Sequence, residues 1–396
     1  MMQKVPGLHL AIDASNIRQG GGLTHLSRLL FAADPVASGI CRVTVWAPRA
    51  TAASLPTRSW LQLRSPSWIE APMPLRVLGQ QLRLNGELKR AGCHLLFSPG
   101  GTLPMCRSVP TVTMSQNMLP FEPNEARLFG RWSPMRLKMW WLRQSQGRSF
   151  RRASGVIFLT NYSKETVVAF LGGITSPLAL IPHGIESRFF QRPKAQQELH
   201  QYSMGQPLRL LYVSILMPYK HQVEVAFAVS QLRREGLPIE MLFIGADWGG
   251  YGRKFRKLLE SLDPGQTYLR WPGGVPFDEL DSHYKEANAF VFASSCENLP
   301  NIMIEAMASG LPIASSNRGP MPEVLAEAGI YFDPEDPESI AVALRQLVNN
   351  VALRSNLAAA AWEKGQVYSW ERCAANTFNF ISRVAMMHMT QHKNLF

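Results

Sequence analysis

Two carboxylates in one short segment, Glu297 and Glu305, are the residues of this chain best placed to do chemistry. Residues 289–293 form an apolar run of strand length. Pro300 suits the first turn of a helix, and Gly310 suits its C-terminal cap. This pattern predicts a strand, a loop and a short helix, with Glu297 in the loop and Glu305 inside the helix.

The start of this helix is expected to bind a ligand. Backbone N–H groups at residues 299–302 have no helical partner, and they face the carboxyl edge of the sheet, where open α/β sheets bind their ligands. Glu305 stands among apolar neighbours, where a carboxylate without a partner would be costly. The alternative is one loop glutamate and one helix glutamate that bind nothing.

The segment Phe292–Ile313 resembles the E-x7-E motif of the retaining glycosyltransferases of family 4, which have the GT-B fold. The likeness continues almost without interruption over residues 208–370. Upstream, residues 181–186 (I-P-H-G-I-E) resemble the I-P-N-G-V-D segment of the family, and Gly20–Gly22 resemble its N-terminal glycine loop. The order and spacing of these pieces make the match specific, whereas each alone would be weak.

The resemblance assigns roles to the segment. Glu305 would hold the ribose hydroxyls of a nucleotide-sugar donor. Glu297, expected as a catalytic residue, would hold a hydroxyl of the transferred sugar, assisted by the main-chain N–H groups of Asn298 and Leu299. Members of the family retain the anomeric configuration without a protein nucleophile, since the leaving phosphate accepts the proton of the acceptor.

Lys220 is the second residue expected to be catalytic. Ser214–His221 resembles the stretch G-R-L-x-x-x-K-G, in which the lysine contacts the donor phosphates, but Ile215 stands at the position of the arginine. Arg318 or Arg18 could supply the missing charge. No D-x-D-type metal motif is present, so we expect neither a metal nor a cofactor. A solvated surface lysine is the alternative for Lys220.

Four further residues are expected to bind the donor. Gly21 and Gly22 would let the backbone approach the phosphates, although a tight turn without a ligand is the alternative. Gly274 belongs to a loop that resembles the one near the base of the donor. Gln116 stands where the family often has a histidine, and it can donate and accept hydrogen bonds but cannot titrate.

The elements that must position these residues alternate between strand-length apolar runs and helical stretches, which predicts parallel sheets covered by helices. The fold class is therefore α/β of GT-B type, with two doubly wound, Rossmann-like domains that face each other across a cleft. We expect an acceptor-binding domain at 1–186, a nucleotide-sugar-binding domain at 187–369, and a C-terminal helix at 370–396, with a return to the first domain as one option for that helix.

The predicted strands are residues 8–14, 42–47, 95–98, 111–115, 155–159 and 178–181 in the first half, and residues 208–215, 240–244, 268–271, 289–293 and 313–315 in the second. Helices are expected at residues 222–235, 252–262 and 277–287.

Charge divides the chain unevenly. The net charge is +12; residues 1–200 hold 24 Lys and Arg against 9 Asp and Glu (+15), and residues 201–396 hold 17 against 20 (−3). The first half should therefore meet an anionic partner. The five cysteines are scattered and odd in number, so we expect no disulfide framework and no zinc site.

Residues 127–152 contain eight Lys and Arg, no acidic residue and several aromatic residues. This composition suits an anionic membrane surface and a polyprenyl-diphosphate-linked acceptor. A basic surface helix with aromatic residues in the core is the alternative. Nucleic acid is disfavoured because no reader motif is present. With no signal peptide and no long apolar segment, the expected location is cytoplasmic, with peripheral binding at the inner face of the cell membrane as an option.

The sequence thus predicts a retaining, metal-independent hexosyltransferase, with mannose as one candidate sugar, that builds a surface polysaccharide or lipopolysaccharide on a glycan or lipid-linked acceptor. A transferase with a soluble acceptor and a non-catalytic nucleotide-sugar-binding or scaffold protein are the alternatives. The donor, the acceptor, the linkage and the oligomeric state are not defined by the sequence.

Overall fold

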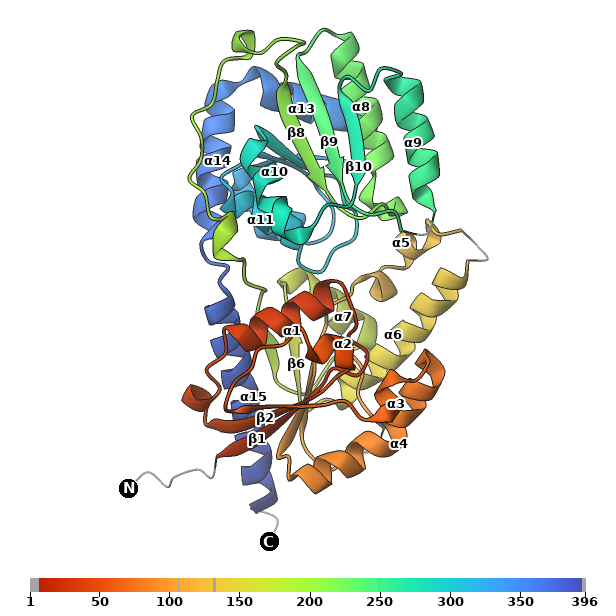
Figure 1. Ribbon diagram of the computed structural model, residues 1–396, viewed down its shortest axis with the longest axis vertical. Coiled ribbons are helices and arrows are strands. Elements are labelled where there is room, and N and C mark those ends of the chain that lie inside the picture. The colour runs from red at the N-terminus through yellow and green to blue at the C-terminus, as the bar shows by residue number, and fades with distance from the viewer. Residues whose placement is uncertain (1–6, 106, 131–132, 249, 394–396) are drawn as a thin grey trace. The chain divides into compact units, whose positions relative to one another are not determined.

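A computed structural model describes residues 7–105, 107–130, 133–248 and 250–393 of the chain (Figure 1). The chain divides into two compact units. Unit 1 comprises residues 1–121, 137–184 and 369–396, and unit 2 comprises residues 122–136 and 185–368. The predicted boundaries at 186 and 369 differ from this division chiefly at residues 122–136, which group with the second unit.

Unit 1 is built on a parallel sheet of seven strands in the order β3-β2-β1-β4-β5-β6-β7. Buried aliphatic and aromatic side chains fill the strands on both faces, which is typical of a parallel sheet covered by helices. The strands are β1 (Leu8–Asp13), β2 (Ile40–Trp46), β3 (Leu61–Arg64), β4 (Leu95–Ser98), β5 (Thr111–Met114), β6 (Gly155–Phe158) and β7 (Leu178–Leu180).

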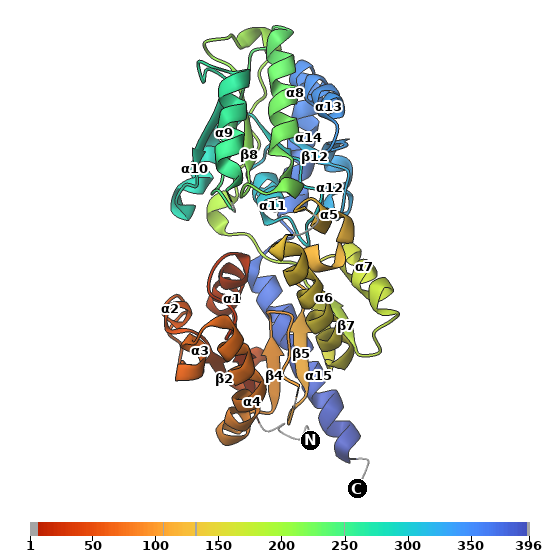
Figure 2. The ribbon, with the colours of Figure 1, turned by 90° about the vertical axis from the view of Figure 1, so that its right-hand side faces the viewer.

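Helices connect these strands, and the C-terminal helix α15 runs along the same unit beside α1 (Figure 2). The helices are α1 (Gly21–Phe31), α2 (Arg49–Ala52), α3 (Ser67–Glu70), α4 (Met73–Ala91), α6 (Pro134–Arg152), α7 (Asn161–Leu171) and α15 (Trp370–Lys393). Helix α15 also packs on β6, because a Cβ on Gly155 would lie 2.8 Å from Val384 and 3.0 Å from Phe380.

The basic segment at 127–152 is not one helix. Arg127 ends the short helix α5 (Pro123–Arg127), and a new helix, α6, begins at Pro134. The residues at 131 and 132 lie outside the described part of the chain, as does Cys106. Residues 122–136 group with unit 2, whereas α6 from Leu137 onward groups with unit 1, so the basic segment is divided between the two units.

Unit 2 is built on a parallel sheet of six strands in the order β10-β9-β8-β11-β12-β13. Its strands are β8 (Leu208–Val213), β9 (Ile239–Ile244), β10 (Leu269–Gly273), β11 (Ala289–Phe292), β12 (Ile313–Ser316) and β13 (Gly329–Phe332). The order reverses between β8 and β11, so the switch point of the sheet lies between these two strands.

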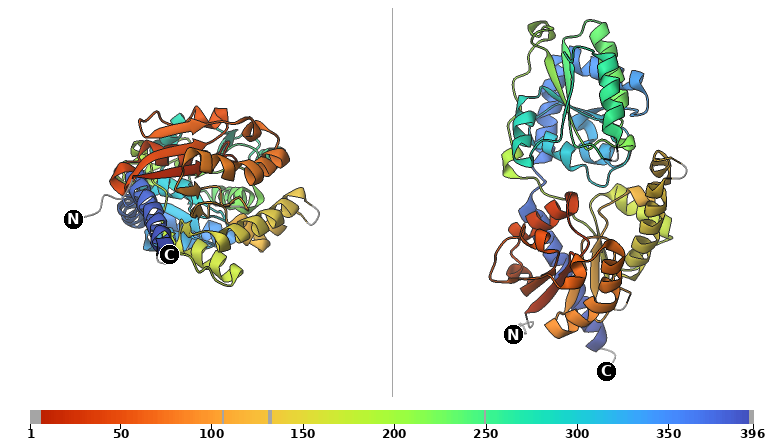
Figure 3. Two further views of the ribbon diagram at one scale, coloured as in Figure 1. Left: turned by 90° about the horizontal axis from the view of Figure 1, so that it is seen from below. Right: turned by 45° about the vertical axis from the view of Figure 1, so that its right-hand side comes forward.

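Helices form layers on this sheet: α8 contacts α9 and α13, and α11 contacts α14 (Figure 3). Besides α5, the helices are α8 (Gln222–Arg234), α9 (Tyr251–Leu262), α10 (Leu280–Glu286), α11 (Asn301–Ala308), α12 (Met321–Leu325), α13 (Pro337–Asn349) and α14 (Val351–Gly365). Over the described residues, no helix combines enough length and hydrophobicity to span a bilayer.

The two parallel sheets confirm the predicted pair of doubly wound α/β domains. Every predicted strand is present, with bounds that shift by one or two residues. Strands β3 and β13 were not foreseen, and the predicted helix at 277–287 is shorter, since residues 277–279 form a 3₁₀ turn before α10.

Candidate functional site

The loop between β11 and α11 carries Glu297, and α11 carries Glu305, as the sequence predicts. Pro300 is the residue before the helix and not part of its first turn. Gly310 has φ of 65° and follows the C-cap. The N–H groups of Gly310 and Leu311 donate to the carbonyls of Met307 and Ala306 at 3.0 and 3.2 Å, the two bonds that close a helix at a glycine.

Lys220 and Glu297 form an ion pair at the carboxyl edge of the unit 2 sheet. Lys220 ends a 3₁₀ turn, η5 (Pro218–Lys220), and its side chain is buried. Its Nζ lies 5.1 Å from the ring centre of Tyr219 and 5.6 Å from that of Phe292. The alternative of a solvated surface lysine is therefore wrong. The structure instead places the Lys220 ammonium close to two aromatic rings and against Glu297, the first glutamate of the motif.

Glu305 has a partner that the sequence did not reveal. Tyr284 lies on α10, which neighbours α11 (Figure 1). Its hydroxyl donates to Glu305 Oε2 at 3.1 Å. Burial raises the pKa of the Glu305 carboxyl to about 8, against the lowering effects of the Tyr284 hydrogen bond and the charge of Arg188. Below that pH the protonated carboxyl can both donate and accept, which suits a vicinal diol such as that of ribose.

The residues next to Glu297 are buried in the same loop. Asn298 and Leu299 are each 6% exposed, so the backbone that precedes α11 is held in place by packing. Cys296 is also buried and unpaired with another cysteine. Burial and the charge of Glu297 raise the pKa of its thiol well above the usual range, which leaves it a poor nucleophile.

Two other predicted residues of unit 2 lie in separate loops. Arg318 forms an exposed ion pair with Asp333, with 2.9 Å between Nη2 and Oδ2. Gly274 follows β10, and a Cβ there would lie 3.5 Å from Ala246, in the loop that follows β9. Both follow the carboxyl ends of strands in the sheet that carries Lys220 and Glu297.

The predicted residues of unit 1 form their own group. Gly20 caps α1 with φ of 71°, and Gly21 and Gly22 are the first residues of that helix. A Cβ on Gly22 would lie 3.5 Å from Gln116 Oε1, so the glycine loop and Gln116 are neighbours. Gln116 is partly exposed and donates to the sulfur of Met114 at 3.2 Å.

Sequence reasoning missed a polar network beside the Lys220–Glu297 pair. Ser295 Oγ lies 3.0 Å from His221 Nε2 and 2.5 Å from Glu125 Oε2, and the Ser295 N–H donates to the Tyr219 carbonyl at 2.9 Å. Glu125 comes from α5, which lies far away in the sequence. No motif or spacing announces its presence.

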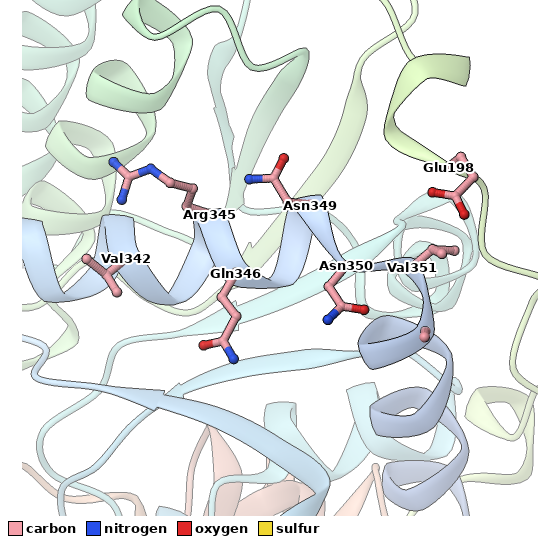
Figure 4. A pocket seen from close by; sticks show the side chains of 8 residues that line it. Glu198, Val342, Arg345, Gln346, Asn349, Asn350 and Val351 are labelled. Atoms are coloured by element: carbon pink, nitrogen blue, oxygen red, sulfur yellow. The ribbon is translucent and has the colours of Figure 1, made fainter.

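A pocket elsewhere in unit 2 is shallow and involves none of the predicted residues (Figure 4). It is lined by Glu198, Val342, Arg345, Gln346, Asn349, Asn350, Val351 and Ala352. Within the described ranges, no group of three or more His, Cys, Asp or Glu side chains is arranged to hold a metal ion.

Comparison with known proteins places this geometry in context. Residues 198–364 match the protein family described as "Glycosyl transferases group 1". A GDP-mannose-dependent alpha-(1-6)-phosphatidylinositol monomannoside mannosyltransferase of Mycobacterium tuberculosis is 28% identical over 241 residues, which cover 57% of this chain and 61% of that protein. The O-antigen chain mannosyltransferase B of Escherichia coli is 23% identical, with 60% and 63% covered. The chain thus matches about three fifths of the length of these relatives.

Solved structures match nearly the whole chain. Sucrose-phosphate synthase from Thermosynechococcus elongatus superposes with a TM-score of 0.71 at 17% identity and covers 98% of this chain and 99% of its own. The Anabaena protein HepE, solved with UDP-glucose, gives a TM-score of 0.67 at 15% identity, with 97% and 100% covered. At such identities the likeness concerns the fold. The fold is of GT-B type, and residues 198–364 of this chain match the family of group 1 glycosyltransferases.

Proposed function

We propose that this protein is a retaining glycosyltransferase that moves a hexose from a nucleotide-diphosphate donor to an acceptor. The observation that carries the proposal is the Lys220–Glu297 ion pair at the entrance of α11, with Glu305 inside the same helix. A cation for the phosphates, a carboxylate for the sugar and a carboxyl for the ribose are the three contacts that a nucleotide sugar needs.

In this proposal the donor diphosphate takes the place of Glu297 as the partner of Lys220. Glu297 then becomes free to accept a hydrogen bond from a sugar hydroxyl, while the first N–H groups of α11 face the donor. As the glycosidic bond to the phosphate breaks, Lys220 stabilises the charge that develops on the leaving oxygen. That oxygen accepts the proton of the attacking hydroxyl, so no protein base and no metal ion are needed.

Mannose is the first sugar to test. Both relatives described above carry the name of mannosyltransferases, and one is named as GDP-mannose-dependent, whereas the HepE structure holds UDP-glucose. The panel therefore needs GDP- and UDP-linked hexoses. We propose further that the glycan belongs to a surface polysaccharide or lipopolysaccharide.

The acceptor is proposed to be lipid-linked and to be reached at the inner, anionic face of the cell membrane. On α6, Leu137 and Trp141 are each 61% exposed and Trp140 is 46% exposed. Leu137 and Trp141 share one helical face with the exposed Arg148 and Arg151. Apolar and basic side chains on one exposed face suit the interface of an anionic bilayer.

Helix α4 adds a second apolar face that the sequence did not reveal. Leu75, Leu78 and Leu82 are 61%, 53% and 71% exposed, and their spacing places them on one side of the helix together with Lys89. Large apolar side chains grouped on an exposed face are costly in water and mark a surface that binds something. We therefore include α4 in the proposed membrane surface.

The test is turnover with a panel of GDP- and UDP-hexoses and a lipid-linked acceptor extract, read by mass spectrometry. We expect a product with one added hexose, equal rates with and without EDTA, and retained anomeric configuration by NMR. Binding of a nucleotide sugar without transfer to any acceptor and without hydrolysis would instead favour the scaffold alternative. A water-soluble product would favour a soluble acceptor.

A further inference from the structure

His221 has an unusual backbone for its residue type. Its φ is 51°, in the left-handed region, and it is the N-cap of α8. A residue with a Cβ pays about 1–2 kcal/mol in that conformation, which glycine avoids. The resemblance to group members predicts a glycine here, and it predicts an arginine where this chain has Ile215. Strained residues of this kind persist where the surrounding contacts use them.

The ring of His221 is held at Nε2 by Ser295. The Ser295 hydroxyl has two acceptors for its single hydrogen, Glu125 Oε2 at 2.5 Å and the Tyr219 carbonyl at 3.3 Å. Since neither partner can donate to it, the hydrogen bond of 3.0 Å between His221 Nε2 and Ser295 Oγ must run from the ring to the hydroxyl. His221 Nε2 therefore carries a hydrogen.

The other ring nitrogen is buried without a hydrogen bond, but a carboxylate lies near it. Nδ1 lies 3.6 Å from Glu224 Oε2, on the first turn of α8, and the His221 side chain is buried. A bare Nδ1 lone pair against a carboxylate is repulsive, whereas an N–H there is attractive. The charged groups around the ring are Glu224 on α8, Glu125 on α5, Asp333 after β13 and the adjacent Lys220. Of these groups, Asp333 pairs with Arg318 and Lys220 pairs with Glu297, so Glu224 and Glu125 are the carboxylates left facing the ring.

The same contacts fix Lys220. Ser295 N–H donates to Tyr219 O, Ser295 Oγ accepts from His221, and Tyr212 donates its hydroxyl to the Lys220 carbonyl. Tyr219 and His221, the residues on either side of Lys220, are thus both hydrogen-bonded to Ser295, in the loop that carries Glu297.

We propose that His221 is a positioning residue of the donor site: hydrogen-bonded to Ser295 and close to Glu224, it fixes Lys220 against Glu297, and in its charged form it supplies the second positive charge that Ile215 does not. This inference rests on the proposed binding of a nucleotide diphosphate by unit 2. It accounts for both departures from the family stretch, since position 215 has an isoleucine in place of the arginine and position 221 has a histidine in place of the glycine.

The test is His221→Gly, measured by calorimetry with UDP and GDP and by thermal unfolding. Glycine suits the backbone, so we expect an unchanged or higher Tm. We expect the Kd of the preferred nucleotide to rise by about tenfold, the effect of losing one hydrogen bond from a charged group. Ser295→Ala should shift the Kd in the same direction by removing the tether. An unchanged Kd in His221→Gly would overturn the proposal.

Gln266→Gly is the matched control. Gln266 also has a positive φ, 49°, and it is exposed in a loop between α9 and β10. This variant should gain the same relief of strain with no change in Kd, and an equal rise in Kd would overturn the proposal. If the wild type binds neither nucleotide, the proposed function fails and not this inference alone.

The charge has its own readout. The Kd ratio of His221→Gly to wild type should be largest near about pH 5.5 and smaller near about pH 8, because histidine loses its charge across this range. Taking the ratio cancels the titration of Glu305 and of the phosphate. A ratio above one that does not change with pH would overturn the proposed charge on His221 and would show that His221 acts only through its hydrogen bond to Ser295.

Discussion

Each unit enters the helix after the first strand of its sheet through an N-cap residue with positive φ, but the two residues differ. In unit 1 the chain passes from β1 to α1 through an N-cap with positive φ, Gly20, whose ψ of −161° is open to glycine but not to residues with a Cβ. In unit 2 it passes from β8 to α8 through a left-handed N-cap that is His221, directly after Lys220. The residue before the helix has no side chain in unit 1, whereas in unit 2 it is a histidine that directly follows the buried Lys220.

The buried ionisable groups differ in the same way. Unit 1 buries two neutral histidines, His25 and His183, with their Nδ1 atoms 2.7 Å apart and Trp370 beside them. It also buries the carboxyl of Asp13, whose hydrogen-bond partners are neutral and whose pKa is raised by burial. Unit 2 buries the Lys220–Glu297 pair and the carboxyl of Glu305. Both doubly wound sheets therefore provide a carboxyl edge at which a ligand could bind. Side chains after β8 and β11 place an ion pair at the edge of the unit 2 sheet, so the side chains and not the fold make the difference.

The largest expected effect comes from removing the cation of unit 2. Lys220→Ala leaves Glu297 without its partner and removes the charge proposed to stabilise the leaving phosphate. We expect kcat/KM to fall by about 100- to 1,000-fold, the range seen when a preorganised electrostatic contact is lost. The measurement is transfer at varied donor concentration. Lys254→Ala, which removes an exposed lysine of α9, is the control. An equal loss of kcat/KM in this variant would show that Lys220 has no specific role at the edge of the unit 2 sheet.

Next in size is Glu305. We expect Glu305→Ala to raise the donor Kd by about tenfold to 100-fold, as for a lost hydrogen bond to a strong partner. Glu305→Gln should cost less, because an amide can also donate and accept where the carboxyl keeps its proton up to about pH 8. Calorimetry at neutral pH measures both. Donor binding equal to wild type in Glu305→Ala would contradict the assignment of this residue to the ribose.

His183 in unit 1 and Glu305 in unit 2 should make stability depend on pH in opposite directions. Burial lowers the pKa of His183 from 6.5 to about 4, so the unfolded chain binds more protons and unit 1 loses stability as pH falls through this range. Burial raises the pKa of Glu305 from 4.5 to about 8, so unit 2 loses stability as pH rises through that range. The full shifts correspond to changes on the order of 3–5 kcal/mol.

Hydrogen exchange followed from about pH 4 to about pH 8 reads each unit separately. His183→Asn should flatten the acid response of unit 1 alone, and Glu305→Gln should flatten the alkaline response of unit 2 alone. Parallel responses of the two units in the wild type would show that the buried groups do not control them.

The smallest effect concerns the surface of unit 1. We expect Leu78→Ser with Leu82→Ser to weaken binding to anionic liposomes by about tenfold, since two large apolar side chains no longer enter the interface. Trp141→Ala should act in the same direction. Flotation with phosphatidylglycerol vesicles measures both, with Val342→Ser, an exposed apolar residue of unit 2, as the control. Retained flotation in all the unit 1 variants would exclude α4 and α6 from the membrane surface.

Sequence reasoning reached the fold and the positions of Glu297 and Glu305 in it for clear physical reasons. Buried parallel strands are continuous apolar runs, so β1, β4, β8 and β11 stand out. Strand β3 did not, because Gln62 and Leu63 are exposed at the edge of the sheet. Glu297 and Glu305 were found because a strand, a proline and a glycine define the helix between them.

What sequence reasoning could not supply are contacts between distant segments. Glu125 reaches Ser295 across 170 residues, and Tyr284 reaches Glu305 from another helix, so no local spacing encodes either pair. The helix break after Arg127 was also missed, because basic and aromatic residues continue through it and only the grouping of α5 with unit 2 reveals it. These contacts decide how Lys220 and Glu305 are held.

The central claim is that the ionic edge of unit 2 binds the donor. Hydrogen exchange of the whole chain, with and without GDP-mannose and UDP-glucose, tests it most directly. We expect protection at residues 214–222 and 295–305 with at least one of the donors, and loss of that protection in Lys220→Ala. Protection confined to other segments, such as the pocket between Glu198 and Asn350, or no protection with any nucleotide sugar, would contradict it.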